Sequence, residues 1–98
     1  MKTLTIIFMV LISLLMGEIL KAQNAGIGSS SFTPDASAGL EIRFTDKGLL
    51  IPRVALTSTS SASPITSPAS SLLVYNTATT GDVTPGYYYW TGNKWMRL

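Results

Sequence analysis

The C-terminal segment 87–98 reads Tyr87-Tyr88-Tyr89-Trp90-Thr91-Gly92-Asn93-Lys94-Trp95-Met96-Arg97-Leu98 and gives the strongest indication of the architecture. Two aromatic or apolar runs flank the pair Gly92-Asn93, and glycine and asparagine readily adopt the backbone conformations of tight turns. This arrangement is typical of two antiparallel strands joined by a two-residue turn. The sequence therefore predicts a β-hairpin over 87–98.

The position of the turn decides which side chains of the hairpin share a face. On one face the predicted cross-strand pairs are Trp90 with Trp95 and Tyr88 with Arg97. On the other face they are Tyr87 with Leu98 and Tyr89 with Met96. Both faces are rich in apolar or aromatic side chains, and an isolated hairpin is only marginally stable in water. At least one face must therefore be covered, by residues 72–75, by residues 40–44 or by another subunit.

Other short runs upstream of the hairpin have the pattern of strands. Residues 40–44 alternate between apolar and charged side chains, and residues 72–75 form a compact apolar run before Asn76, which favours a turn. Residues 49–51 precede Pro52 and predict a short buried or edge strand, which Val54 and Leu56 extend. We expect Ile27 to lie in a short strand or to make a contact from an extended segment.

The segments between these runs are rich in Ser, Thr, Pro and Gly. Residues 57–71 are low in complexity, and Pro64 and Pro68 prevent regular pairing, so we expect a loop or flexible crossover there. Residues 23–39 predict a flexible N-terminal segment with a turn or single helical turn at 33–38, and residues 77–85 predict a polar linker. The predicted fold class is mostly β, with short strands, a C-terminal hairpin and long loops after an N-terminal signal helix.

The first 22 residues have the organisation of a secretory signal peptide. Lys2 is followed by an apolar run over 4–16, which is too short for a transmembrane helix of about 20 residues. Cleavage between Ala22 and Gln23 leaves one small β-rich module, residues 23–98, with no membrane span. We therefore expect a secreted or cell-surface protein, with the periplasm as an alternative. The other reading is an uncleaved anchor whose apolar run continues through residues 19 and 20.

The mature chain, residues 23–98, is small and carries little net charge. Its 76 residues allow one domain at most, and a chain this short is marginally stable without help. Cysteine is absent, so no disulfide supports the fold, and oligomerisation is the expected support. The five basic residues are scattered among four acidic ones, so there is no charged stripe for nucleic acid.

The residue types needed for catalysis are scarce. Histidine and cysteine are both missing, and neither Lys47 nor Lys94 lies in a pattern that predicts an activated base for a serine. The four mature carboxylates fall on turns and exposed strand positions, without metal-loop spacing. We predict no enzymatic activity, no metal and no cofactor.

The aromatic hairpin is the one feature that could carry binding. We select Tyr88, Trp90, Trp95 and Arg97 as the candidate binding or interface residues, because exposed Tyr and Trp stack on sugars and anchor interfaces. A role for these rings in the core or in a subunit interface is favoured in so short a chain. The alternative is a carbohydrate-binding module that uses the hairpin to hold a glycan.

Several segments together resemble the N-terminal module of exported Bacteroidetes proteins. The segments that carry this resemblance are Gly26-Ile27-Gly28 with 33–38 (TPDASA), 46–53 (DKGLLIPR), 67–69 (SPA) leading into 72–77 (LLVYNT), and 86–90 (GYYYW) closing on Lys94-Trp95. In such proteins the module often precedes fibre-like regions, some of which end in a tail-spike type chaperone peptidase domain. The resemblance covers nearly all of the mature chain.

The resemblance implies an extracellular structural or adhesive role in a homo-oligomer, with a trimeric, phage-tail-like stalk as one form, or together with longer fibre-like homologues. The sequence carries no fibre region, peptidase or sorting domain after Leu98. We therefore expect a stand-alone paralogue, a component that joins a longer homologue, or the product of a truncated reading frame. No catalytic residue is implied.

Overall fold

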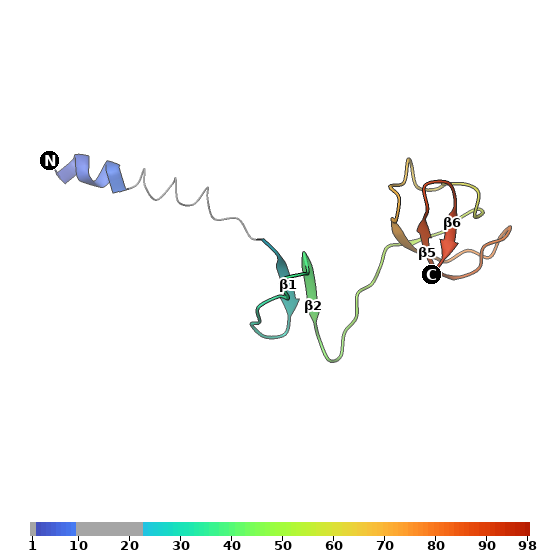
Figure 1. The fold of residues 1–98 in the computed structure, drawn as a ribbon, viewed down its shortest axis with the longest axis horizontal. Coiled ribbons are helices and arrows are strands. Elements are labelled where there is room, and N and C mark those ends of the chain that lie inside the picture. The colour runs from blue at the N-terminus through green and yellow to red at the C-terminus, as the bar shows by residue number, and fades with distance from the viewer. Residues whose placement is uncertain (1, 10–22) are drawn as a thin grey trace. The chain divides into compact units, whose positions relative to one another are not determined.

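The computed structural model describes residues 2–9 and 23–98 (Figure 1). Residues 2–9 are helical and lie within the predicted signal peptide. The rest of that peptide, including the predicted cleavage-site residue Ala22, lies outside the described residues. Within the described part of the chain, no helix has the length and hydropathy needed to cross a bilayer.

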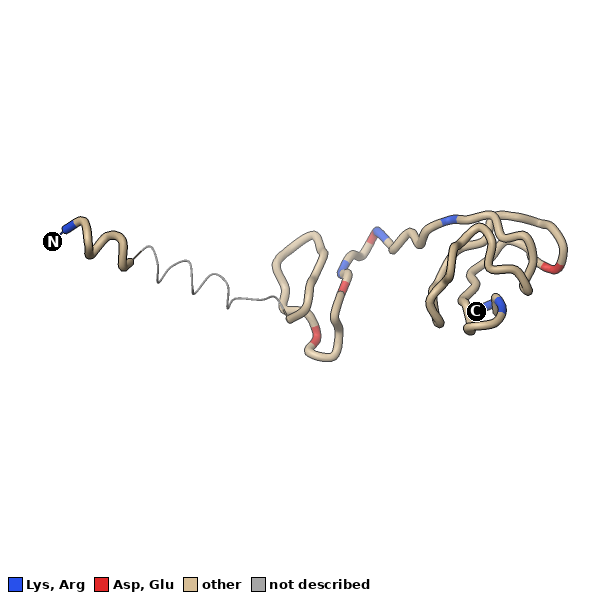
Figure 2. The backbone as a smooth tube through the Cα atoms, turned by 90° about the horizontal axis from the view of Figure 1, so that it is seen from above, with Lys and Arg blue, Asp and Glu red and all other residues tan. Residues whose placement is uncertain are grey.

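The chain divides into two compact units, Met1–Gly48 and Leu49–Leu98. The described residues form six short strands in two sheets, which confirms the predicted mostly β fold. Acidic and basic residues are spread singly or in small groups along the chain, as the tube view shows (Figure 2).

The N-terminal unit contains a two-stranded parallel sheet. Strand β1 (Ala25–Gly28) pairs with β2 (Leu40–Arg43), so that Ile27 lies opposite Ile42. The predicted strand at 40–44 is thus present apart from its last residue. The predicted flexible segment 23–39 contains β1 and the connection that returns the chain to β2.

Phe32 packs on the glycines of β1. A Cβ atom built on Gly26 would lie 2.7 Å from the Phe32 ring, and one built on Gly28 would lie 2.8 Å from it. Such a separation is too short for two carbon atoms, so only glycine lets the ring lie this close to the strand. The Arg43 guanidinium lies 4.5 Å from the centre of the same ring and stacks on it.

The connection between β1 and β2 turns at Asp35. Its carboxylate accepts hydrogen bonds from the backbone N–H of Ser37, at 2.9 Å, and from the Ser37 hydroxyl, at 2.6 Å. The turn predicted at 33–38 is therefore present, and the Asp35 side chain stabilises it.

The C-terminal unit is built on a four-stranded sheet in the order β3-β4-β5-β6. Its strands are β3 (Arg53–Val54), β4 (Leu73–Asn76), β5 (Gly86–Trp90) and β6 (Trp95–Arg97). Strands β4, β5 and β6 are antiparallel neighbours, whereas β3 is parallel to β4. The predicted hairpin pairs, Trp90 with Trp95, Tyr88 with Arg97 and Tyr89 with Met96, are confirmed.

The strand predicted at 49–51 is absent. Leu49 is 59% exposed and Leu50 is 71% exposed, and β3 begins only after Pro52. The ladder to β4 starts at the Pro52 carbonyl, which accepts a 3.0 Å hydrogen bond from the Tyr75 N–H. The prediction places the strand too early because its pairing partner, β4, is reached only by the residues from Pro52 onward.

The core of the C-terminal unit lies on one face of the sheet, the inner face. The buried apolar residues are Leu56, Val74, Val83, Tyr88, Trp90 and Trp95, and Val54, Ala62 and Ile65 pack against them. Val83 belongs to the predicted polar linker 77–85, where it forms an isolated β-bridge with Thr80. The two long loops, 57–71 and 77–85, thus contribute side chains to the core.

Candidate functional site

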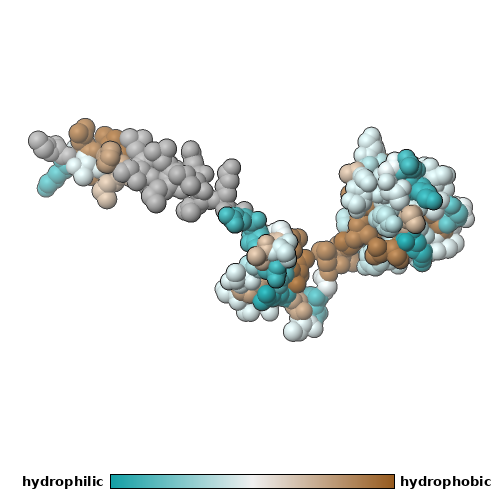
Figure 3. Space-filling view, in the orientation of Figure 1, coloured by the Kyte–Doolittle hydropathy of each residue, from teal (hydrophilic) through white to brown (hydrophobic). Residues whose placement is uncertain are grey.

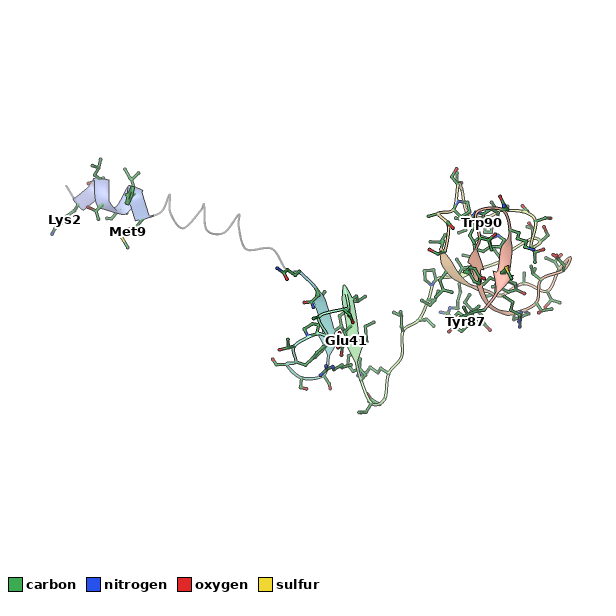
Figure 4. All side chains as sticks on the ribbon, viewed as in Figure 1. Lys2, Met9, Glu41, Tyr87 and Trp90 are labelled. Atoms are coloured by element: carbon green, nitrogen blue, oxygen red, sulfur yellow. The ribbon has the colours of Figure 1, made fainter. Side chains whose placement is uncertain are left out.

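Three of the four predicted site residues lie in the core of a single chain. Tyr88 is 3% exposed, Trp90 is 8% exposed and Trp95 is 1% exposed. The two indole rings are 5.1 Å apart at an interplanar angle of 65°, an edge-to-face contact that stabilises aromatic pairs. Side chains crowd around β5 and β6, and Trp90 lies among them (Figure 4).

Loop 57–71 covers the two tryptophans. The Trp95 backbone N–H donates to the Thr59 carbonyl, and the Trp95 indole N–H donates to the Ser61 carbonyl, both at 2.8 Å. At the end of the loop, the Ser71 N–H donates to the Trp90 carbonyl at 2.6 Å. The segment is a loop, as predicted, but it serves as the cover of the inner face and not as a free crossover.

This cover changes the interpretation of the aromatic residues. A sugar or a second subunit that stacks on an indole ring needs an exposed ring face, and here the faces are occupied by the loop and the core. Tyr88, Trp90 and Trp95 therefore belong to the apolar core of the C-terminal unit.

Arg97, the fourth predicted residue, lies over the Tyr88 ring. Its guanidinium carbon is 5.4 Å from the ring centre, and its nitrogens donate to the Tyr88 hydroxyl at 2.9 Å and to the Pro85 carbonyl at 2.8 Å. Burial of the Tyr88 phenol opposes its ionisation, but hydrogen bonds with Thr84 and Arg97 outweigh this and lower its pKa. Arg97 thus fastens the 77–85 loop to the hairpin.

Asn76 is the buried polar centre of the unit, with 0% of its surface exposed. Its side-chain oxygen accepts hydrogen bonds from the backbone N–H groups of Leu56 and Ala78, both at 3.0 Å. Its amide nitrogen donates to the carbonyls of Ala78 and Thr84, both at 2.9 Å. The side chain thereby makes all four hydrogen bonds that an asparagine amide can make, which offsets the cost of its burial.

Asp82 joins the two loops that cover the inner face. One carboxylate oxygen accepts a 2.8 Å hydrogen bond from the Thr59 N–H, and the other accepts one from the Thr59 hydroxyl. These hydrogen bonds favour the ionised carboxylate and hold the pKa of Asp82 below its usual value.

The opposite face of the C-terminal sheet, the outer face, is aromatic and only partly covered. Its side chains are those of Leu73 and Tyr75 on β4, Tyr87 and Tyr89 on β5, Met96 on β6, and Leu98 at the end of the chain. Tyr87 is 41% exposed, Met96 is 42% exposed and Leu98 is 79% exposed.

Local contacts order this outer face. The rings of Tyr75 and Tyr87 meet edge to face with centres 5.0 Å apart, and the Tyr89 hydroxyl lies 3.6 Å from the Met96 sulfur. A hollow of about 260 Å³ lies beside the tyrosine pair, lined by Leu50, Ile51, Arg53, Tyr75 and Tyr87. The face is therefore preformed in a single chain.

Comparison with known families identifies what kind of protein carries this sheet. The sequence profile of the family described as phage tail like trimerisation region matches residues 26–98, which is well over half of the chain. The chain belongs to the phage tail like trimerisation region family. No curated protein and no solved structure matches it.

Membership of the trimerisation family agrees with the predicted fibre-like module. A trimerisation region holds copies of a chain together, so the protein is a structural, self-associating module, as predicted. The predicted homo-oligomer is confirmed at this level, with a trimer as the form that the family description indicates.

The carboxylates of this trimerisation module make local contacts. Glu41 accepts a 2.8 Å hydrogen bond from the Asp35 N–H and pairs with Arg43, and the contact with Arg43 is the main cause that lowers the pKa of Glu41. Within the described residues, no three His, Cys, Asp or Glu side chains come together in a way that could hold a metal ion.

Two features of the C-terminal unit are not predicted by the sequence pattern. Asn76 has the pattern of a turn former, and no sequence signal distinguishes it from an exposed turn asparagine. In a strand, Leu73 and Tyr75 lie on the face opposite to Val74, but this apolar run does not indicate which of the two faces the loops cover.

Proposed function

We propose that this chain is an exported structural module that joins copies of itself into trimers within a fibre-like assembly at the cell surface. The observation that carries the proposal is the combination of a trimerisation-family match over residues 26–98 with a partly exposed aromatic face on the C-terminal sheet. A small unit with one face filled by its own loops and the other face open gains stability when copies associate.

The location in the proposal rests on the N-terminal sequence. Lys2 and the apolar run over 4–16 are typical of a secretory leader, and residues 2–9 are helical. We propose that the protein is released after cleavage between Ala22 and Gln23 and acts outside the cytoplasmic membrane, together with copies of itself or with longer fibre-like homologues.

The structure favours this function over carbohydrate binding. The alternative assigned a glycan to Tyr88, Trp90 and Trp95, which lie at 8% exposure or less. Stacking on a sugar requires an exposed ring face, so the burial of these three side chains does not support them as a glycan site.

The proposal is tested by expressing the whole chain in an exporting bacterium and purifying the product. Intact mass spectrometry is expected to show a chain that starts at Gln23, and light scattering across a dilution series is expected to give three times the mass of that chain. A folded monomer at every concentration would contradict the structural proposal. A chain that keeps its first 22 residues would contradict the proposed processing.

A further inference from the structure

We propose that the outer face of the C-terminal sheet is the surface on which a second copy of this chain packs. This inference rests on the proposed function, because it names the surface through which the module trimerises. It commits to another copy as the occupant, since the family to which the chain belongs is one of trimerisation regions.

The two faces of the C-terminal sheet differ in what covers them. The buried apolar residues of the inner face are at 8% exposure or less, and loops 57–71 and 77–85 are fastened over them. On the outer face, Tyr87, Met96 and Leu98 keep 41%, 42% and 79% of their surface exposed. An apolar face that a single chain leaves open in this way is typical of a protein interaction site.

The outer face also has the chemistry of an interface. Tyrosine and methionine are enriched at the centres of protein interfaces, and charged residues are depleted there. The outward side chains of β4, β5 and β6 include no charged group, and the only charge in the lining of the hollow is Arg53, on the edge strand β3. Such a face fits a partner surface of the same apolar character.

The apolar surface extends beyond the strands themselves. The exposed residues Leu49 and Leu50 precede β3, and Leu50 lines the hollow together with Tyr75 and Tyr87. Hydrophobic surface follows the segment that leads into β3 and continues on the adjoining side of the C-terminal unit (Figure 3). A stable interface buries about 800 Å² on each partner, and the exposed apolar segment adds area to that of the sheet face.

The outer face can satisfy the symmetry of a trimer. A closed ring of three copies requires a heterologous contact, in which two different patches of the chain meet. The outer face offers two such patches, the hollow beside Tyr75 and Tyr87 and the exposed side chains of Met96 and Leu98. In the trimer we infer, Met96 and Leu98 of one copy meet the hollow of the next.

The first experiment compares Met96→Glu with the control Thr79→Glu in the protein purified from whole-chain expression. Thr79 is exposed in loop 77–85, which packs on the opposite side of the sheet, so the control introduces the same charge away from the proposed surface. Met96→Glu is expected to raise the trimer dissociation constant at least about tenfold by light scattering, because charge is excluded from interface centres. Thr79→Glu is expected to leave it unchanged, and the emission of the buried Trp90 and Trp95 reports whether each variant is folded.

A second experiment keeps the inference testable if Met96→Glu does not fold. The natural chain has no cysteine, so Met96→Cys and Thr79→Cys each introduce a single reactive thiol. In the trimer, a maleimide is expected to label Met96→Cys at least about tenfold more slowly than Thr79→Cys, and dilution to the monomer is expected to abolish the difference.

The outcomes separate the two proposals. A wild-type trimer in which Met96→Cys labels as fast as Thr79→Cys, or in which a folded Met96→Glu stays trimeric, would overturn the assignment of the surface and leave the trimeric function intact. A wild-type protein that is monomeric at every concentration would overturn both.

Discussion

The two compact units of this chain both contain short strands, but they differ in how far their apolar side chains are buried. All the buried apolar side chains of the described residues belong to the C-terminal unit, whereas the described strand β1 of the N-terminal unit is exposed along its whole length. The C-terminal unit has two long loops that fold back over one face of its sheet, and the β1–β2 pair is ordered by Phe32, Arg43 and turn hydrogen bonds. Strand content alone therefore does not make a stable unit, because stability follows from covered apolar area.

Substitutions of equal chemical size are therefore expected to have unequal effects in the two units. Both tryptophans of the chain lie in the C-terminal unit, so their fluorescence follows the unfolding of that unit. The stability of variants is best compared with this probe at one fixed protein concentration, because association also changes apparent stability.

The largest expected effect is that of Trp95→Ala. Trp95 is 1% exposed and contacts Trp90, so its truncation leaves a large cavity and is expected to cost about 3–5 kcal/mol, a large part of the stability of a small domain. Urea denaturation followed by the emission of Trp90 measures the loss. Trp95→Phe, which retains a ring but loses the bond to Ser61, is expected to cost less. An unchanged urea midpoint for Trp95→Ala would show that the core around Trp95 does not support the unit.

Removal of the buried amide is expected to have the next largest effect. Asn76→Ala leaves the Leu56 and Ala78 N–H groups without their acceptor, so we expect a loss of about 1–3 kcal/mol in the same denaturation experiment. Asn93→Ala, in the exposed hairpin turn, is the matched control and is expected to change stability by less than about 0.5 kcal/mol. Equal effects of the two substitutions would contradict the role of Asn76 as an organiser of the loops.

A smaller effect is expected from pH. The pKa of Asp82 is lower in the folded chain than in the unfolded chain, because hydrogen bonds from Thr59 favour its ionised form. Its contribution to stability is therefore present above its unfolded pKa of about 3.9 and is lost as the pH falls through the lower folded value.

The measurement is the melting temperature of the C-terminal unit between about pH 5 and pH 2, which spans the usual aspartate pKa. Asp82→Asn is expected to make this melting temperature fall less as the pH is lowered. Asp35→Asn also removes a carboxylate whose pKa is lowered, by hydrogen bonds from Ser37, but Asp35 lies in the N-terminal unit, so the pH dependence of the melting temperature is expected to stay unchanged. A larger effect of Asp35→Asn than of Asp82→Asn would show that the N-terminal turn controls the stability of the C-terminal unit.

The smallest effect is expected from Ile27→Ser and Leu40→Ser. These residues are 53% and 54% exposed on β1 and β2, and each substitution is expected to change the unfolding free energy of the C-terminal unit by less than about 0.5 kcal/mol. A loss of more than about 1 kcal/mol, well outside the range for exposed sites, would show that the N-terminal unit supports the other one.

The sequence predicts the strand pairing within the hairpin well, but it predicts the pairing between distant segments poorly. The pairing of Trp90 with Trp95 follows from the position of a two-residue turn, so residue order alone is enough to predict it. The parallel pairings of β1 with β2 and of β3 with β4 join segments separated by long loops, and the sequence contains no comparable signal for them. For the same reason the strand expected at 49–51 lies after Pro52 instead of before it.

The fold class, the hairpin register and the lack of cysteine and histidine chemistry follow from residue type and short-range spacing, so they can be predicted from the amino-acid order. The difference in exposure between the two faces of the hairpin is visible only in the folded chain. Both faces carry large apolar rings, and the difference arises when loops 57–71 and 77–85 fold over Tyr88, Trp90 and Trp95 and leave Tyr87, Met96 and Leu98 exposed. Which face is covered depends on contacts between residues that are far apart in the chain, such as Asp82 with Thr59 and Asn76 with Leu56. Local sequence patterns do not predict such contacts, because each of them requires a long loop to close.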